Sequence, residues 1–429
     1  MNILILGASG FIGSAVARRL SADGHAVTGL GRNLAAMRRR MAFITWREAD
    51  LATLVLPASW QAHLDGIDVV VNAAGALQDG ARDDLAAVQD RAMQALYVAA
   101  QSRVEPPLVV QVSARTDGPG SHTAFLATKR RADEALKASG LPHVVLRPAL
   151  VLGRNAHGGS ALLRALAAMP CVTPLIHAES PVATVGLDDV AAAVSDAVAG
   201  TIPAGSDLEL AAPRPVALAD LVALHRSWLG LAPARRWSVP LFAAIPVVAA
   251  ADMAGRLGWR APLRSTAMRV MQGGVTAAAS AEAPGRTLRD AGAVLAANPA
   301  GVQDLWFARL YLLKPLVVVC LSVFWLASGL VPFWNFAPAY AHFSPLMPPG
   351  WAAAAVIATC LADILLGAAV LARKHARRAM QGMVVLAAAY LAAATLVEPS
   401  LWLDPLGPLV KVLPSVVLAL VGLAILDER

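Results

Sequence analysis

The chain has 429 residues, of which 57% are hydrophobic and only 15% charged, and its mean hydropathy is +0.58. Soluble domains average about 45–50% apolar and about 25% charged residues, so this composition excludes a disordered chain and indicates that part of it lies in a lipid bilayer. The three cysteines share no metal-ligand spacing, which excludes a zinc module and a disulfide scaffold, and we expect no metal centre. The net charge of +7 is spread over short clusters, so we expect no nucleic-acid partner.

The first element is an apolar run, Ile3–Leu6, that leads directly into a glycine-rich turn and a helical pattern. Such a run is typical of a central parallel strand, and no basic segment precedes it as in a secretory signal. In the turn, GASGFIG, the spacing of Gly7, Gly10 and Gly13 suits a tight turn, a close approach to pyrophosphate and close helix packing. N–H groups at the helix start attract the anion. The residues predicted to contact the nucleotide here are Gly7, Ser9, Gly10, Phe11, Ile12 and Gly13.

The second predicted strand, Ala26–Leu30, is followed by Gly31 and Arg32. At this place in a dinucleotide fold an acidic residue binds the ribose 2′-hydroxyl of NAD, whereas an arginine accommodates a 2′-phosphate. Arg32 therefore favours NADP(H) over NAD(H), with an ordinary surface arginine as the alternative.

From there to about residue 300, short β-rich runs alternate with helical stretches, and charged residues recur throughout. This alternation predicts an α/β region with a doubly wound parallel sheet. Over about residues 1–230 the motifs resemble, in order, those of extended and atypical short-chain dehydrogenases/reductases, including epimerase-like and NmrA-like members. The resemblance implies an NAD(P)-binding Rossmann domain with a small substrate-type subdomain.

Several later segments carry this resemblance. They are Asp50-Leu51 after the third strand, the NAAG segment Asn72–Gly75, the VVQVSA segment Val109–Ala114, the LRPALVLG segment Leu146–Gly153 and the segment Val185–Val194. The cofactor contacts that the resemblance implies are Asp50, Leu51, Ala73, Ala74, Gly75, Lys129 and Pro148. It also implies that Ser113 is the catalytic serine.

One residue departs from the family pattern. The family's Tyr-x-x-x-Lys pair aligns with FLATK, so Phe125 takes the tyrosine position and Lys129 the lysine position. In the family the tyrosine exchanges a proton with the substrate, and phenylalanine cannot do so. Ser113 and Lys129 remain as catalytic candidates, Lys129 being either a ribose contact or a solvated residue. The substitute proton donors, each with an ordinary structural role as the alternative, are His122, Thr123 and Thr128.

The C-terminal part has a different composition. Four apolar runs of about the length that crosses a bilayer predict four transmembrane helices, at Pro315–Trp334, Trp351–Ala372, Ala379–Val397 and Pro408–Leu426. The second loop carries RKHARR, Arg373–Arg378, whereas the first loop, Val331–Gly350, carries no Lys, Arg, Asp or Glu. The positive-inside rule therefore places the second loop, the N-terminal domain and both termini in the cytoplasm.

The segments Gly258–Thr276 and Trp306–Val319, with Lys314-Pro315, resemble bacterial proteins in which an atypical short-chain dehydrogenase-like domain precedes a DoxX-like four-helix membrane domain. The resemblance implies a multi-pass protein of the bacterial inner membrane and makes a quinone or other small lipophilic acceptor a candidate partner. Inside the spans, Asp363 and Lys411 are candidate functional groups because ionisable side chains are costly in a bilayer. A structural hydrogen bond and snorkelling to an interface are their respective alternatives.

The expected organisation follows from these segments. Residues 1–155 form the Rossmann core, 156–276 complete that fold and add the substrate-type subdomain, 277–308 form a linker, and 309–429 form the membrane domain. We expect a membrane-anchored NADP(H)-binding oxidoreductase. The alternative is an NAD(P)-binding module for structure or redox sensing without turnover, because of the missing tyrosine.

Overall fold

The computed structural model describes residues 1–75, 84–117, 121–261, 263–265, 268–269, 274–276, 286–405 and 407–427. Residues 277–285 of the predicted linker, and part of the segment 258–276, therefore lie outside the described residues. The chain divides into two compact units. The first unit comprises Met1–Asp252 and Ala261–Ala308, and the second comprises Met253–Arg260 and Arg309–Glu428.

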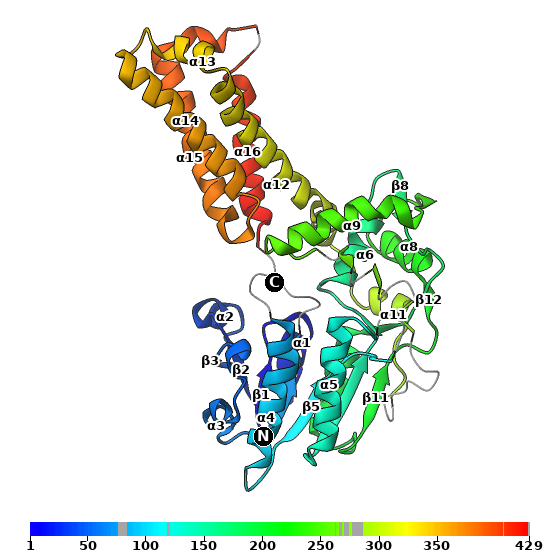
Figure 1. The fold of residues 1–429 in the computed structure, drawn as a ribbon. Helices are drawn as coiled ribbons and strands as arrows, with labels where there is room; N and C mark the ends of the chain where they lie inside the picture. The colour runs from blue at the N-terminus through cyan, green and yellow to red at the C-terminus, as the bar shows by residue number, and fades with distance from the viewer. Residues whose placement is uncertain are drawn as a thin grey trace. The chain divides into compact units, whose positions relative to one another are not determined.

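The described part of the first unit is built around a seven-stranded parallel sheet with the strand order β11-β6-β5-β4-β1-β2-β3 (Figure 1). The strands are β1 (Asn2–Leu6), β2 (Ala26–Gly31), β3 (Thr45–Glu48), β4 (Val69–Asn72), β5 (Leu108–Val112), β6 (His143–Pro148) and β11 (Asp207–Leu210). The order reverses direction between β1 and β4, which pair with Ile3 beside Val69. The predicted doubly wound α/β fold is thus confirmed.

Helices cover both faces of the sheet because alternate strand residues point to opposite sides. Ile3 and Ile5 pack against α1 (Phe11–Ala22) and α7 (Leu187–Val198). Leu4 and Leu6 pack in a second cluster with α4 (Ala92–Gln101) and α5 (Ala124–Ala138). All four strand residues are fully buried. The continuous apolar run Ile3–Leu6 therefore contributes side chains to the hydrophobic clusters on both faces of the sheet.

The rest of the first unit forms a smaller core beside the sheet. Arg164 of α6 (Gly159–Ala167) is buried there, 3.2 Å from Asp304 and 4.5 Å from the centre of the Trp228 ring. Ala291 and Val294 of α11 (Ala291–Ala296) are buried in the same cluster. The described part of the segment predicted as a linker is therefore packed, because its apolar residues complete this core.

The remaining elements of the first unit are short. They are α2 (Leu34–Arg40), the 3₁₀ turns η1 (Leu51–Thr53) and η2 (Pro57–Trp60), α3 (Gln61–Leu64), the π-helical turn η3 (Ala87–Arg91), β7 (Leu150–Leu152), β8 (Val172–Leu175), β9 (Pro181–Val182), β10 (Thr184–Gly186), β12 (Val216–Ala217), α8 (Leu218–Trp228) and β13 (Arg235–Ser238). Helix α9 (Leu241–Arg256) runs past the end of the first unit as delimited above.

The second unit is helical. Within the described residues, α12 (Val302–Trp334), α14 (Pro349–Ala369) and α15 (Arg373–Val397) are long and apolar enough to cross a bilayer. The fourth predicted span is shorter than expected: α16 (Leu413–Ile425) has 13 residues and follows the 3₁₀ turn η5 (Val410–Val412). Pro414 lies in the first turn of α16 and limits its extension toward the N-terminus. A short helix, α13 (Phe336–Phe343), and a 3₁₀ turn, η4 (Pro399–Trp402), lie between the longer ones.

Small residues let the helices of this unit approach closely. A side chain at Gly329 of α12 would lie 2.5 Å from the Cys360 carbonyl oxygen, and one at Gly367 of α14 would lie 2.8 Å from the Leu326 nitrogen. Ser322 Oγ also donates to the Gly367 carbonyl at 2.7 Å. Such contacts are typical of helix pairs in membranes, where close packing and hydrogen bonds replace the hydrophobic effect.

Candidate functional site

The glycine turn joins β1 to α1 at the carboxyl end of the sheet. Gly7 has φ of +74°, and a Cβ there would lie 2.8 Å from the Ala73 carbonyl oxygen. A Cβ at Gly13 would lie 2.1 Å from the Gly7 carbonyl oxygen. Both positions therefore require glycine, one for its backbone conformation and one for the contact of α1 with the turn.

The start of α1 offers backbone donors to an anion. Gly10 is its N-cap residue, and its N–H donates to the Gly7 carbonyl at 2.9 Å. No side chain caps this helix end, so backbone N–H groups of the first turn face outward with the positive end of the helix dipole. Ser9, Phe11 and Ile12 are half-buried around this turn. The geometry fits a dinucleotide pyrophosphate.

Two predicted cofactor residues follow the neighbouring strands. Arg32 is exposed and comes directly after the last residue of β2. Asp50 lies two residues beyond β3, where its carboxylate accepts a hydrogen bond from the Ala52 N–H at 3.1 Å and caps η1, which begins at Leu51. Both therefore lie at the carboxyl ends of the strands, as the glycine turn does.

A buried amide fixes the turn after β4. Asn72 Nδ2 donates to Gln111 Oε1 at 2.8 Å, and Asn72 Oδ1 accepts from the Ala74 N–H at 3.0 Å. This side chain is 3% exposed. The segment Ala73–Gly75 is thereby held against the glycine turn, since Ala73 also meets Gly7.

The structure brings Lys129 to the same edge. Lys129 Nζ donates to the Val112 carbonyl at 3.1 Å, at the end of β5, and lies 3.7 Å from the place where a Cβ on Gly75 would be. The side chain is 8% exposed, so it is not the solvated residue that the sequence left open. Burial lowers the pKa of Lys129 from 10.5 to about 8.

Ser113, also at the end of β5, is engaged within the protein. Its Oγ donates to Asp133 Oδ2 at 2.6 Å, and both residues are buried. Asp133 in turn pairs with Arg147 at 2.8 Å. Burial raises the pKa of the Asp133 carboxyl, against the opposing effects of Ser113 and Arg147.

In the structure, Phe125 occupies the expected tyrosine position and offers no hydroxyl group. Phe125 lies in the first turn of α5, with its ring centre 5.8 Å from Lys129 Nζ. Thr123 caps α5 and the Thr128 hydroxyl bonds Gln89 Oε1 at 3.1 Å, so both have structural roles. His122 is exposed. Burial raises the pKa of Tyr97, whose hydroxyl lies within the core, so this tyrosine is no substitute acid.

Sequence reasoning missed the buried polar residues around Ser113. Asp133 follows Lys129 by four residues, hence on the same helix face, and this spacing could have indicated it. Arg147 precedes the predicted cofactor residue Pro148, and pairs with Asp207 at 2.7 Å as well as with Asp133. Gln89 gave no comparable signal, because its segment has no motif.

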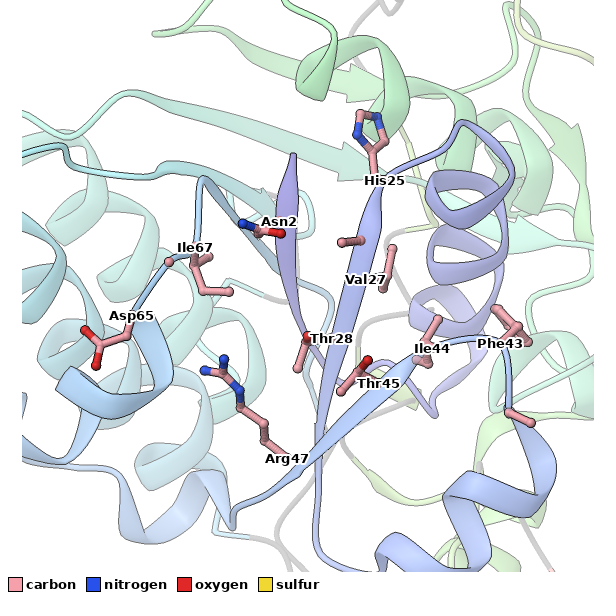
Figure 2. Close-up of a pocket in the computed structure, with 13 residues that line it drawn as sticks. Asn2, His25, Val27, Thr28, Phe43, Ile44, Thr45, Arg47, Asp65 and Ile67 are labelled. Carbon is pink, nitrogen blue, oxygen red and sulfur yellow. The ribbon is translucent and has the colours of Figure 1, made fainter.

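A cavity of about 560 Å³ lies at the end of the sheet opposite the glycine turn. Figure 2 shows Asn2 at the start of β1, Thr28 on β2, and Thr45 and Arg47 on β3 around it. Most of the lining residues lie at or just before the amino ends of the strands, whereas ligands of doubly wound sheets bind at the carboxyl ends. This cavity is therefore separate from the glycine turn.

Comparison with known families gives one match within each of the two compact units. Residues 7–171 match the NAD(P)H-binding family, and residues 322–420 match the DoxX-like family. The chain joins an NAD(P)H-binding Rossmann domain to a DoxX-like domain. Both resemblances drawn from the sequence are thus confirmed, and no curated protein matches the chain at a significant level.

The chain is similar to several solved structures over 56–72% of its length. The crystal structure of gox2253 is 21% identical, with the match covering 72% of this chain and 97% of that chain at a TM-score of 0.52. WbmH of Bordetella bronchiseptica, solved with NAD+, is 20% identical over 56% of this chain and 85% of its own, with a TM-score of 0.46. UDP-glucuronic acid 4-epimerase of Bacillus cereus, solved with NAD, is 16% identical over 57% and 92%, with a TM-score of 0.47. At 21% identity the match to gox2253 supports the fold alone.

Proposed function

We propose that the chain is a membrane-anchored oxidoreductase that uses NADP(H) in preference to NAD(H) and transfers reducing equivalents to a small or lipophilic acceptor, with a quinone as candidate. The observation that carries this proposal is the position of Lys129. Its Nζ lies between the Val112 carbonyl and Gly75, at the carboxyl end of the sheet that bears the glycine turn. A nicotinamide ribose bound at this edge would find a buried cation there.

Different residues of the chain would bind different parts of the cofactor. The N–H groups of the first turn of α1 hold the pyrophosphate, and the carboxylate of Asp50 orients the adenosine half. Lys129 would donate to the nicotinamide ribose, and Ala73–Gly75 would line the cofactor. The nicotinamide ring, when bound, supplies or accepts the hydride.

The proposed preference for NADP(H) rests on Arg32, and it can be tested separately from catalysis. Arg32→Asp should weaken NADPH binding by tenfold or more, because a charge-assisted contact to the 2′-phosphate is lost. It should leave NADH binding at least as tight as in the wild type, because an acidic residue at this place binds the ribose 2′-hydroxyl. Arg18→Asp is the matched control, since Arg18 is also exposed and the change of charge is the same. Equal losses in both variants would refute a specific role for Arg32. The measurement is equilibrium binding of each nucleotide to the purified full chain.

A non-catalytic nucleotide-binding module is the second candidate, and two observations favour it. Phe125 offers no proton, and the Ser113 hydroxyl is already committed to Asp133 at 2.6 Å. A serine whose proton is held by a buried carboxylate does not orient a substrate carbonyl by donating to it. Under this reading the bound nucleotide serves structure or redox sensing.

Steady-state oxidation of NADPH by the full chain in detergent separates the two candidates. We expect the wild type to oxidise NADPH with a short-chain quinone or a carbonyl acceptor, and Gly10→Val to lose this activity, because the branched side chain enters the anion site. Tight NADPH binding without turnover, with activity only in Phe125→Tyr, would instead support the module. Phe125→Leu is the control for repacking at this position.

The same proposal includes the orientation in the bacterial inner membrane. The basic segment Arg373–Arg378 supports a cytoplasmic position for the loop before α15 and hence for the Rossmann domain and both termini. Cytoplasmic NADPH would then reach the glycine turn directly.

A further inference from the structure

A cavity of about 350 Å³ lies within the second unit. One wall is a single face of α14, on which Val356, Thr359, Cys360 and Asp363 recur at helical spacing. The remaining walls come from α12, α13 and α15. This volume is in the range of small-molecule sites, about 300–1,000 Å³.

Two polar side chains of this cavity bond one carboxyl group, whereas Thr359 bonds the Ala355 carbonyl of its own helix and His342 lines the cavity from α13. Asp363 is 4% exposed, and its two oxygens each accept one hydrogen bond. Ser328 Oγ donates to Oδ2 at 2.7 Å, and the Tyr390 hydroxyl donates to Oδ1 at 2.9 Å. Three helices therefore converge on this carboxyl group, and the part of the lining that the structure describes contains no lysine or arginine.

Around Asp363, the side chains of Ser328 and Tyr390 leave mainly hydrogen-bond acceptors for a ligand. A carboxylate offers about four lone-pair sites, and two of them are used by the hydroxyls. The hydroxyl protons are spent on Asp363, so Ser328 and Tyr390 also present lone pairs. A ligand head that fits must donate hydrogen bonds, and a positive charge would compensate the buried carboxylate.

We propose that this cavity binds a small lipophilic primary amine in its protonated form. The ammonium group donates to Asp363, and its three protons match the available lone pairs of Asp363, Ser328 and Tyr390. The apolar body lies along α14 toward Val356, which is seven residues and about 10 Å from Asp363 along the helix axis. The ligand class is thus an ammonium head on an apolar chain or ring system of about that length.

This site is independent of the nucleotide site, because every lining residue belongs to the second unit. A failure of the oxidoreductase proposal would leave it standing, and its own failure would leave the nucleotide site unaffected. Its test therefore uses ligand binding and no redox assay.

The probe is 4-(4-fluorophenyl)butylamine, whose length matches the cavity and whose fluorine reports binding by NMR line broadening. The neutral control is 4-(4-fluorophenyl)butanol, which keeps the donor and the body but lacks the charge. The full chain is held in nanodiscs of zwitterionic lipid, and nanodiscs without protein give the partition into lipid alone.

We expect the amine to bind at least tenfold more tightly than the alcohol, because only the ammonium group brings a positive charge that compensates the buried carboxylate. Asp363→Asn should abolish this preference while keeping the size of the side chain. Ala339→Phe should weaken both probes by filling the cavity from α13 and leaving the carboxyl group intact, which keeps the test valid if Asp363→Asn does not fold. Ser322→Ala is the matched control, since Ser322 bonds α14 outside the cavity.

Equal binding of amine and alcohol to the wild type would overturn the proposal. So would a preference for the amine that persists in Asp363→Asn, or amine binding unchanged in Ala339→Phe, because the probe would then be bound elsewhere or only dissolved in lipid.

Discussion

At the scale of single residues, the burial of Lys129 has a measurable cost. Its pKa of about 8 lies below the value of 10.5 for a free lysine, because burial disfavours the charged form. Between these two pH values the unfolded chain binds more protons than the folded one, so stability rises with pH across this window and is lower below pH 8. The shift corresponds to about 3 kcal/mol at neutral pH.

Lys129→Met should therefore raise the melting temperature of the nucleotide-free chain relative to wild type by several degrees at pH 7. This advantage should shrink steadily between about pH 8 and about pH 10.5, where the wild-type lysine has lost its proton in the folded chain but still holds it in the unfolded chain. Thermal unfolding of both proteins across this pH range measures the difference. Parallel pH profiles would contradict a buried, perturbed lysine, and Lys137→Met, at a half-exposed position of the same helix, serves as control.

The sequence predicted residues of this site only where a local pattern carries them. The glycine turn and the Phe125 substitution are visible because their spacing is tied to one turn or one helix. The bond from Ser113 to Asp133 joins residues 20 positions apart, and only the packing of α5 on the sheet brings them together. Arg147 joins the same network from β6. Such partners depend on tertiary contacts, which single-sequence patterns do not encode.

At the scale of elements, the proposed nucleotide site depends on the attachment of α1 to the glycine turn. A Cβ at Gly13 would lie 2.1 Å from the Gly7 carbonyl oxygen, so Gly13→Ala must push the start of α1 away from the turn. We expect NADPH affinity to fall by at least tenfold, because the N–H groups that hold the pyrophosphate lose their alignment. Equilibrium binding to the full chain measures this loss.

Gly24→Ala is the matched control, because Gly24 ends the same helix with φ of +86° and nothing lies within 4 Å of a Cβ there. This change strains the backbone by about 1 kcal/mol without touching the turn. A similar loss of affinity in both variants would mean that general destabilisation, and not the turn, is responsible.

The apolar runs predicted helices well because composition alone fixes where helices can lie in lipid. Three of the four predicted spans are confirmed as helices of sufficient length. The fourth differs because prolines at Pro408 and Pro414 interrupt helical hydrogen bonding, which hydropathy does not register.

At the scale of the whole molecule, the short α16 raises the question of which side of the membrane holds the C-terminus. Contacts within the second unit give an answer. The Leu426 carbonyl accepts from Lys314 Nζ at 3.1 Å and from the Arg373 guanidinium at 2.9 Å, and Arg377 pairs with Asp427 at 2.6 Å. The end of α16 therefore lies at the basic end of the bundle, where α15 begins and where the apolar part of α12 begins.

This arrangement requires α16 to return the chain to the side of Arg373–Arg378 despite its 13 residues. In a chain with Cys171, Cys320 and Cys360 replaced, we expect Ala341→Cys to react with a membrane-impermeant maleimide on intact spheroplasts. His375→Cys and Asp427→Cys should react only after permeabilisation, because the proposed orientation puts the basic end of the bundle in the cytoplasm. Labelling of Asp427→Cys together with Ala341→Cys on intact spheroplasts would mean that α16 does not cross. Because His375 is exposed at the start of α15, its protection in intact spheroplasts would reflect the membrane and not burial within the protein.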